Sequence, residues 1–231
     1  MNPNSRSAEI EVKFWEAAKD GNVEEVKEIL RNNPTIDVNW KGVAGFTALT
    51  QACWRGHDSI VSLLLAHPDI DVNQKTKDGS TPFVKACCYG RTSCVRLLLK
   101  DHRVLVNEQS VGSTPLSMAA SNGHLDITKL MIASGKELNL GAPGMKSDAI
   151  GRAWTKGETD VATLLERFKE NPEKTRSEVR KELKITGRYP SSSSFSFPLT
   201  EFICSSIRFP CDYPTKAHQG AIHRLPCRKA L

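Results

Sequence analysis

Three stretches of the sequence decide the fold: TALTQACWRGHDSIVSLLLAHPDIDVN at residues 47–73, TPFVKACCYGRTSCVRLLLKDHRVLVN at residues 81–107 and TPLSMAASNGHLDITKLMIASGKELNL at residues 114–140. They are copies of one template, and weaker copies occur at residues 13–39 and 149–172. Each copy has a glycine at the same place, with spacings of 35, 34, 33 and 34 residues between Gly21, Gly56, Gly90, Gly123 and Gly157. A period of this length predicts a solenoid of stacked units.

The first half of the template predicts a short helix. A threonine precedes it in the three clear copies and suits the N-cap, where its hydroxyl accepts a hydrogen bond from a free backbone N–H. Pro82 and Pro115 occupy the first turn, where proline is favoured. A large apolar residue and, three positions later, an alanine recur in all five copies, which predicts a narrow buried face with a neighbouring helix close to the alanine. The glycine then ends the helix in the left-handed conformation.

The second half of the template predicts a more apolar helix. Its leucines, isoleucines and valines are too many for one face, so we expect this helix to be covered on two sides. Fully burying each Leu or Ile contributes about 1.5–3 kcal/mol. Polar stretches between the copies, including Asp78-Gly79, predict β-hairpin fingers. The sequence therefore predicts an all-α fold, a solenoid of helix-turn-helix units that carry β-hairpin fingers.

These features resemble the ankyrin repeat. Its signature T-P-L-H-x-A appears as Thr47-Ala48-Leu49-Thr50-Gln51-Ala52, Thr81-Pro82-Phe83-Val84-Lys85-Ala86 and Thr114-Pro115-Leu116-Ser117-Met118-Ala119. The resemblance covers residues 9–170 and implies an ankyrin-repeat solenoid of five units, at residues 9–39, 40–73, 74–107, 108–140 and 141–170, with the two end units as polar caps. A tetratricopeptide array, the alternative at this period, is not expected to contain the Asp-Gly finger.

The chain departs from the family signature at the histidine. Its place is taken by Thr50, Val84 and Ser117 in the clear copies, and by Trp15 and Gly151 in the end units. In the family this histidine ties the helix start to a neighbouring finger, so we expect a less rigid stack, by about 1 kcal/mol for each missing buried bond. Threonine and serine can keep part of this bonding, but Val84 cannot.

The resemblance also implies a surface that binds another protein. In the family, the fingers and the exposed face of the first helices form a concave side that contacts partners. Carried over by position, the partner-binding residues are Val43, Ala44, Phe46, Trp54, Arg55, Lys77, Asp78, Ser80, Cys88, Tyr89, Ser110, Val111, Ser113, Ser121 and Asn122. Trp54, Arg55 and Tyr89 are the expected anchors, because Trp, Tyr and Arg dominate interface energies. The alternative is that Trp54 and Tyr89 pack beneath the fingers as ordinary stack residues.

The sequence favours a non-catalytic binding module, acting as a regulatory or adaptor subunit. A phosphate-binding loop, a nucleophile elbow and an HExxH motif are all absent, so we expect no enzyme activity, no cofactor and no metal. His57 and His124 fill a structural position of the family. We expect the protein to be a monomer whose partner is another protein, with no membrane and no nucleic acid involved.

Charge, hydropathy and cysteine content limit the possible cellular location. Residues 186–231 hold six Lys/Arg and two Asp/Glu, so they supply +4 of the net charge of +6 and the repeats are close to neutral. No stretch approaches the ~18 apolar residues of a membrane span, and the N-terminus has no secretory signal pattern. Seven cysteines without a CxxC pair favour a cytoplasmic or nuclear location. We expect Cys53, Cys87 and Cys94 in the core and Cys88 at the surface.

The C-terminal part is predicted to differ from the repeats. Residues 171–187 predict an amphipathic helix, capped by Asn171, that packs on the last unit or is free in solution. Residues 188–231 predict a disordered tail. Two explanations for it stay open: it is a short linear motif or basic arm, or it comes from a gene-model error such as a translated intron. Its cysteines and histidines (Cys204, Cys211, His218, His223 and Cys227) give the alternative function, a zinc-binding or nucleic-acid-binding tail, although their spacing fits no familiar zinc finger.

Overall fold

The computed structural model describes residues 3–185 of the chain, and the side chains of residues 7–185. The predictions for the tail at residues 188–231, including its zinc or nucleic-acid role, lie outside the described residues.

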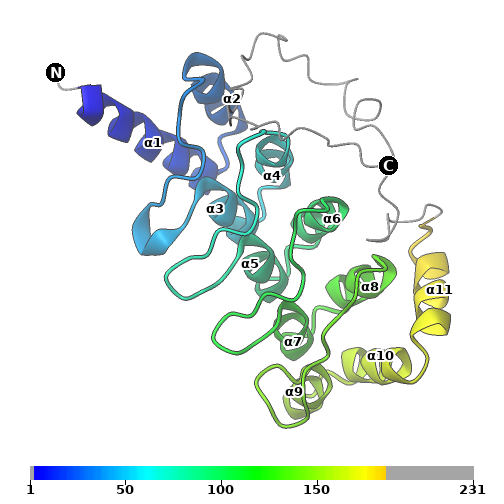
Figure 1. Cartoon of the computed structure of the whole chain (residues 1–231). Coiled ribbons are helices and arrows are strands. Elements are labelled where there is room, and N and C mark those ends of the chain that lie inside the picture. Colours follow the sequence, from blue (N-terminus) through cyan, green and yellow to red (C-terminus); the bar gives the residue numbers. More distant parts are fainter. Residues whose placement is uncertain (1–2, 186–231) are drawn as a thin grey trace, which may run out of the picture. The chain divides into compact units, whose positions relative to one another are not determined.

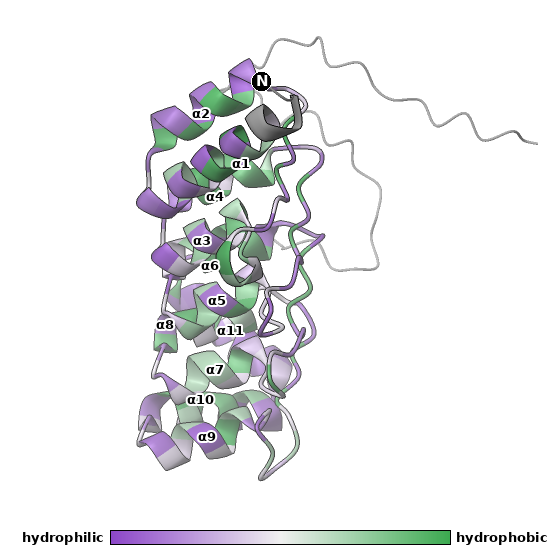
Figure 2. Ribbon diagram, turned by 90° about the vertical axis from the view of Figure 1, so that its left-hand side faces the viewer, coloured by the Kyte–Doolittle hydropathy of each residue, from purple (hydrophilic) through white to green (hydrophobic). Residues whose placement is uncertain are grey.

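The described part consists of successive antiparallel helix pairs. The inner helices are α1 (Pro3–Asp20), α3 (Ala48–Arg55), α5 (Pro82–Cys88), α7 (Pro115–Ser121) and α9 (Ala149–Lys156). The outer helices are α2 (Val23–Asn32), α4 (Asp58–Leu65), α6 (Thr92–Lys100), α8 (Leu125–Ala133) and α10 (Thr159–Glu170), and α11 (Pro172–Glu182) follows. Inner helices form one row and outer helices a second row (Figure 1), and the finger loops project on one side of both (Figure 2). The predicted all-α solenoid is confirmed.

The core runs the length of the stack because each inner helix packs against the next, so that α3, α5 and α7 have inner helices on both sides. Ala52, Ala86 and Ala119 are fully buried where adjacent inner helices meet, which confirms why the template keeps a small residue there. Leu49, Phe83 and Leu116 are also fully buried. A larger residue at the alanine positions would overpack the contact, at a typical cost of about 1–3 kcal/mol.

The predicted helix ends are present. The hydroxyl of Thr47 accepts from the Thr50 backbone N–H at 3.1 Å, and Thr81 and Thr114 cap α5 and α7 in the same way. Gly56 and Gly157 end α3 and α9 with φ of +94° and +78°, a region that favours glycine. The first inner helix, α1, has 18 residues and begins at Pro3, whereas the other inner helices have seven or eight residues.

The fingers are turns rather than paired strands. Within residues 3–185 the only β-bridge joins Ser110 and Ser113. The finger before α5 is closed by a hydrogen bond from the Thr76 N–H to the Ser80 carbonyl at 3.0 Å, and no ladder extends from it. The β-hairpin prediction was therefore right about the turn and wrong about the strands, because the segments between turn and helix are too short to pair.

In the three central units, the residue that follows the glycine fastens its unit to the preceding one. The His57 ring bonds the Lys19 carbonyl at 3.0 Å, the Arg91 Nε donates to the Trp54 carbonyl at 2.9 Å, and the His124 ring bonds the Cys88 carbonyl at 3.1 Å. These bonds occupy carbonyls at the ends of the inner helices, which have no partner inside the helix. His57 and His124 are structural, as the resemblance implies.

Two other side chains replace the missing signature histidine. The Trp15 indole N–H donates to the Phe46 carbonyl of the next finger at 2.8 Å, and the Ser117 hydroxyl bonds the Lys146 carbonyl at 3.3 Å. The Thr50 hydroxyl instead meets the Thr47 hydroxyl of its own cap, and Val84 is buried without a polar group. The expected loss of a hydrogen bond to the neighbouring finger therefore applies to Thr50 and Val84. Trp15 keeps such a bond, which the sequence did not predict.

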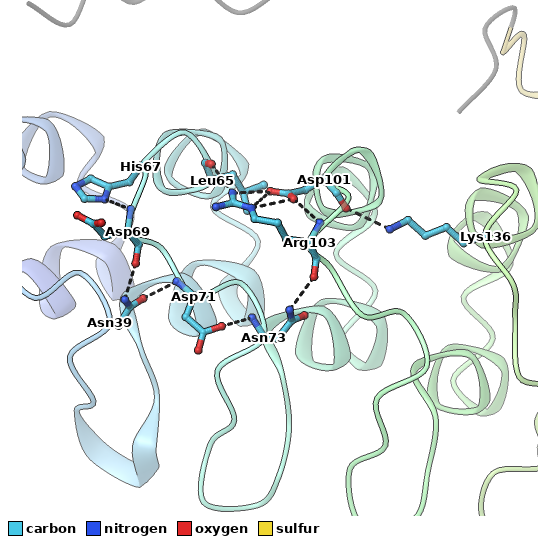
Figure 3. A network of polar contacts seen from close by, with 9 residues as sticks. All are labelled: Asn39, Leu65, His67, Asp69, Asp71, Asn73, Asp101, Arg103 and Lys136. Atoms are coloured by element: carbon cyan, nitrogen blue, oxygen red, sulfur yellow. Dashed lines mark hydrogen bonds and ion pairs between the residues drawn. The ribbon is translucent and has the colours of Figure 1, made fainter. Parts of the chain in front are cut away.

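One asparagine in each of the first three units links consecutive outer loops, and Figure 3 shows two of the three. The Asn39 side chain donates to the Asp69 carbonyl at 2.7 Å and accepts from the Asp71 N–H at 2.8 Å. Asn73 bonds Arg103 and Leu105 in the same two ways, and Asn107 bonds Glu137 and Asn139. We call this repeated contact the asparagine ladder. It satisfies loop backbone groups that form no helix or sheet bond.

A second set of contacts reinforces the ladder beside it. Arg103 Nη2 donates to the Leu65 carbonyl at 2.9 Å and to the Asp101 carboxylate at 2.7 Å. Lys136 Nζ reaches the Asp101 carbonyl from the next unit at 3.2 Å (Figure 3). Burial opposes ionisation of Asp101, but its hydrogen bonds with Arg103 outweigh this and lower its pKa.

The C-terminal helix packs on the stack. The Asn171 side chain caps α11 by accepting from the Lys174 N–H at 3.1 Å, as predicted. Val179 is buried, and the Arg176 and Arg180 Nε atoms donate to the Ile132 and Ala133 carbonyls at the end of α8, at 3.2 and 2.7 Å. Of the two placements predicted for this segment, the structure has the packed one, against both α8 and α10.

We predict that Asn73→Ala lowers the free energy of unfolding by about 1–3 kcal/mol, because it leaves the Arg103 carbonyl and the Leu105 N–H without their partner. Urea denaturation followed by circular dichroism measures the change. The matched control is Asn139→Ala, whose side chain accepts only from the Gly141 N–H of its own loop at 2.9 Å. Equal losses in the two variants would contradict a role for Asn73 between units.

Candidate protein-binding surface

The fingers and inner helices bring most of the predicted residues to one side of the stack, but at different depths. Exposed residues are Val43, Ala44, Arg55, Lys77, Asp78, Tyr89, Val111 and Asn122. Half-buried residues are Phe46, Trp54 and Cys88. Buried residues are Ser80, Ser110, Ser113 and Ser121.

The four serines correct the sequence prediction, because they are not on the exposed surface. The Ser80 and Ser110 hydroxyls bond each other at 2.8 Å, which joins two fingers. Arg152 donates to the Ser113 and Ser121 hydroxyls at 2.8 and 3.1 Å, which joins α9 to the preceding unit. Position in the repeat does not reveal this burial, since Ser110 corresponds to Val43 and Lys77, which are exposed, and Ser121 corresponds to Trp54 and Cys88, which are half-buried.

Three aromatic rings form the centre of the surface. The Phe46 and Trp54 ring centroids are 5.5 Å apart, and the Trp54 and Tyr89 centroids are 5.8 Å apart in an edge-on arrangement. Such contacts contribute about 0.5–1.5 kcal/mol beyond their burial. Trp54 therefore packs at the base of a finger, as the structural alternative expects, while Tyr89 remains 47% exposed.

Two cations lie against these rings. The Arg55 guanidinium stands 4.9 Å from the centroid of Trp54, and the Lys85 ammonium stands 5.1 Å from that of Phe46. Lys85 also forms an ion pair with Asp78 at 2.6 Å, which ties a finger to α5. Lys85 was not among the predicted residues, although it occupies the x position of the T-P-L-H-x-A signature, on the side of the helix that faces the finger.

Asp78 is held as a carboxylate. Partial burial opposes its ionisation, but hydrogen bonds from Lys85, Thr76 and Ser80 outweigh burial and keep its pKa well below the usual range. The finger is therefore fixed by a charged contact as well as by its backbone turn.

The finger tips present apolar side chains directly to solvent. Val43 and Val111 are 76% and 67% exposed. Ala44 and Val111 have φ of +56° and +51°, which is uncommon for residues other than glycine and strained for a β-branched one. Met145 is 62% exposed in the last finger and was missed, because that finger lacks the spacing of the others.

Cys53, Cys87 and Cys94 are fully buried free thiols, as predicted. Cys88 was expected at the surface but is half-buried. Burial raises the pKa of Cys53 and Cys87, and it raises that of Cys94 to about 11, so these thiols are unreactive. Among the described residues, no group of three or more His, Cys, Asp or Glu side chains is arranged to hold a metal ion.

The geometry defines a repeat protein with an open, finger-lined surface. A family model of ankyrin repeats in three copies matches residues 14–76 and 68–142, which is more than half of the chain. The chain belongs to the ankyrin repeat family. A search of curated proteins found no match. No helix among residues 3–185 is long and apolar enough to cross a membrane.

We predict that Asp78→Asn lowers the melting temperature at pH 7 and that the difference from the wild type shrinks as the pH falls. The folded pKa of Asp78 is depressed, so its contribution is present above its unfolded pKa of about 4 and is lost as the pH falls below that value. Differential scanning fluorimetry between pH 7 and pH 3 measures the change. Asp126→Asn, which changes an exposed carboxylate of α8, should have a smaller effect. A difference that grows towards pH 3 would contradict the prediction.

Proposed function

We propose that this chain is a non-catalytic module that binds a partner protein through its fingers and inner helices, as a regulatory or adaptor subunit. Ankyrin repeats are generally protein–protein interaction modules, and the family is typically non-enzymatic. The partner is another protein, and the isolated chain is a monomer. The location is a reducing one, cytoplasmic or nuclear, since four cysteines of the repeats are free thiols.

One observation carries the proposal: aromatic and apolar side chains are exposed together on one side of the stack. Tyr89 stands beside Trp54, and Val43 and Val111 extend from the fingers on either side of the one that holds Lys77 and Asp78. An open row of this kind suits a protein surface, with Trp, Tyr and Arg as anchors and smaller contacts around them. The alternative, zinc or nucleic-acid binding through the tail, concerns residues outside the described part, and no observation favours it.

We predict that a photo-crosslinking amino acid placed at Tyr89 in the full chain captures a protein that the same amino acid at Arg96 does not. Both side chains are exposed, but Arg96 lies on the outer helix α6. Crosslinked products from cell extract are separated by electrophoresis and identified by mass spectrometry.

A variant tests whether the anchors act in binding or only in folding. Trp54→Ala with Tyr89→Ala should abolish the product crosslinked from a probe at Lys77, while circular dichroism of the variant retains the helical spectrum. Products that form equally from Tyr89 and Arg96, or that survive the double substitution, would contradict the proposal.

A further inference from the structure

Charge is distributed unequally between the two sides of the central units. The finger and inner-helix segments at residues 40–56, 74–90 and 107–123 hold five Lys/Arg and two Asp/Glu. The outer segments at residues 57–73, 91–106 and 124–139 hold six of each. The finger side therefore has a formal charge of +3, and the outer side has none. A near-neutral total over the repeats conceals this difference.

Both acids of the finger side are already paired. Asp78 binds Lys85 at 2.6 Å and Glu108 binds Lys75 at 2.5 Å. The other three cations are Lys41, Arg55 and Lys77, and no carboxylate of the described residues forms an ion pair with them. The Lys41 ammonium is 3.3 Å from the Lys75 carbonyl, so it is held at the finger base. The excess positive charge is therefore exposed and uncompensated.

Arg55 is held in a position to bind a carboxylate. Its guanidinium lies 4.9 Å from the centroid of Trp54, and the side chain is exposed. This cation–π contact leaves N–H groups of the guanidinium available to donate two parallel hydrogen bonds to a carboxylate. Because the contact with Trp54 already restricts the side chain, less entropy is lost when an anion binds.

Apolar surface lies next to these charges. Tyr89 contacts the edge of Trp54 at a centroid distance of 5.8 Å, and Val43 stands at the tip of the finger that carries Lys41. An occupant that matched only the charge would leave these side chains in water. The surface fits a ligand that carries both carboxylates and at least one large apolar side chain.

We propose that the partner presents an acidic protein segment with an aromatic or large aliphatic residue, which binds across the fingers of the second and third units, at residues 40–46 and 74–80. Its carboxylates meet Arg55, Lys77 and Lys41, and its apolar side chain packs on Tyr89 and Trp54. This rests on the function proposed above and adds the chemistry of the partner. A nucleic acid is disfavoured because only three cations of the finger side are without a carboxylate partner among the described residues, and the same side exposes the apolar Val43 and Val111.

The test selects peptides from a random twelve-residue library displayed on phage, with the full 231-residue chain immobilised at physiological salt. Enriched sequences are synthesised with fluorescein, and binding is measured by anisotropy. We expect net negative peptides with a conserved aromatic or aliphatic position, and an affinity that falls as salt rises. Arg55→Ala with Lys77→Ala should weaken binding about tenfold. Arg96→Ala with Lys100→Ala, which removes the same charge from α6, should leave binding unchanged.

The outcomes separate this inference from the proposed function. Selection of neutral or basic peptides that no longer bind the Trp54→Ala, Tyr89→Ala variant would overturn the inference that the partner is acidic. The same result would support the proposed binding surface. Peptides insensitive to every finger-side substitution would overturn both, as would the absence of enrichment. Equal weakening by the two charge-removing variants indicates attraction to net charge alone and overturns the inference. Tighter binding of a fluorescent twelve-nucleotide oligothymidine than of any peptide would also overturn it.

Discussion

The register of the stack depends on one side-chain amide in each of the first three units. Asn39, Asn73 and Asn107 each donate to a carbonyl and accept from an N–H in the following loop, so two backbone groups per loop are satisfied by a neighbour. Apolar burial makes the units associate, but it is not directional. The paired hydrogen bonds fix how far one unit is displaced along the next. That displacement determines which finger residues lie side by side.

The surface that we propose for partner binding depends on this register. Phe46, Trp54 and Tyr89 come from two units, and their ring contacts require α3 and α5 to be aligned. The Lys85–Asp78 ion pair and the Ser80–Ser110 hydrogen bond then position the fingers over the inner helices. These contacts lie beneath the surface, so Tyr89, Arg55 and the finger tips remain exposed. The same rigid support that orders the loops reduces the entropy lost on binding.

The sequence predicted the fold well because the repeat is local. Caps such as Thr81 and terminating glycines such as Gly56 act within one helix, and their roles were read correctly. Ala86 acts between helices, but its recurrence at one place in every copy was enough to predict the close contact. Contacts between units were harder to predict. Ser113 and Ser121 were assigned to the surface because nothing in their own unit shows that Arg152 reaches them from α9. The ladder asparagines did recur at a spacing of 34 residues between Asn39, Asn73 and Asn107, which is the signal that could have identified them. The acidic partner proposed here could not be predicted from composition, because the net charge of the repeats does not show which cations of the finger side lack a carboxylate partner in the part of the chain that the structure describes.

Amide hydrogen exchange measured by NMR at the loop N–H groups of Asp71, Leu105 and Asn139 tests the central claim most directly. Each of these groups donates to an asparagine of the preceding unit and to no helix carbonyl. If the ladder holds the stack in register, these three loop amides exchange as slowly as the amides inside α4 and α6. Exchange at either place then requires neighbouring units to separate. Exchange at the rate of an unstructured loop, with the helices still protected, would contradict the account.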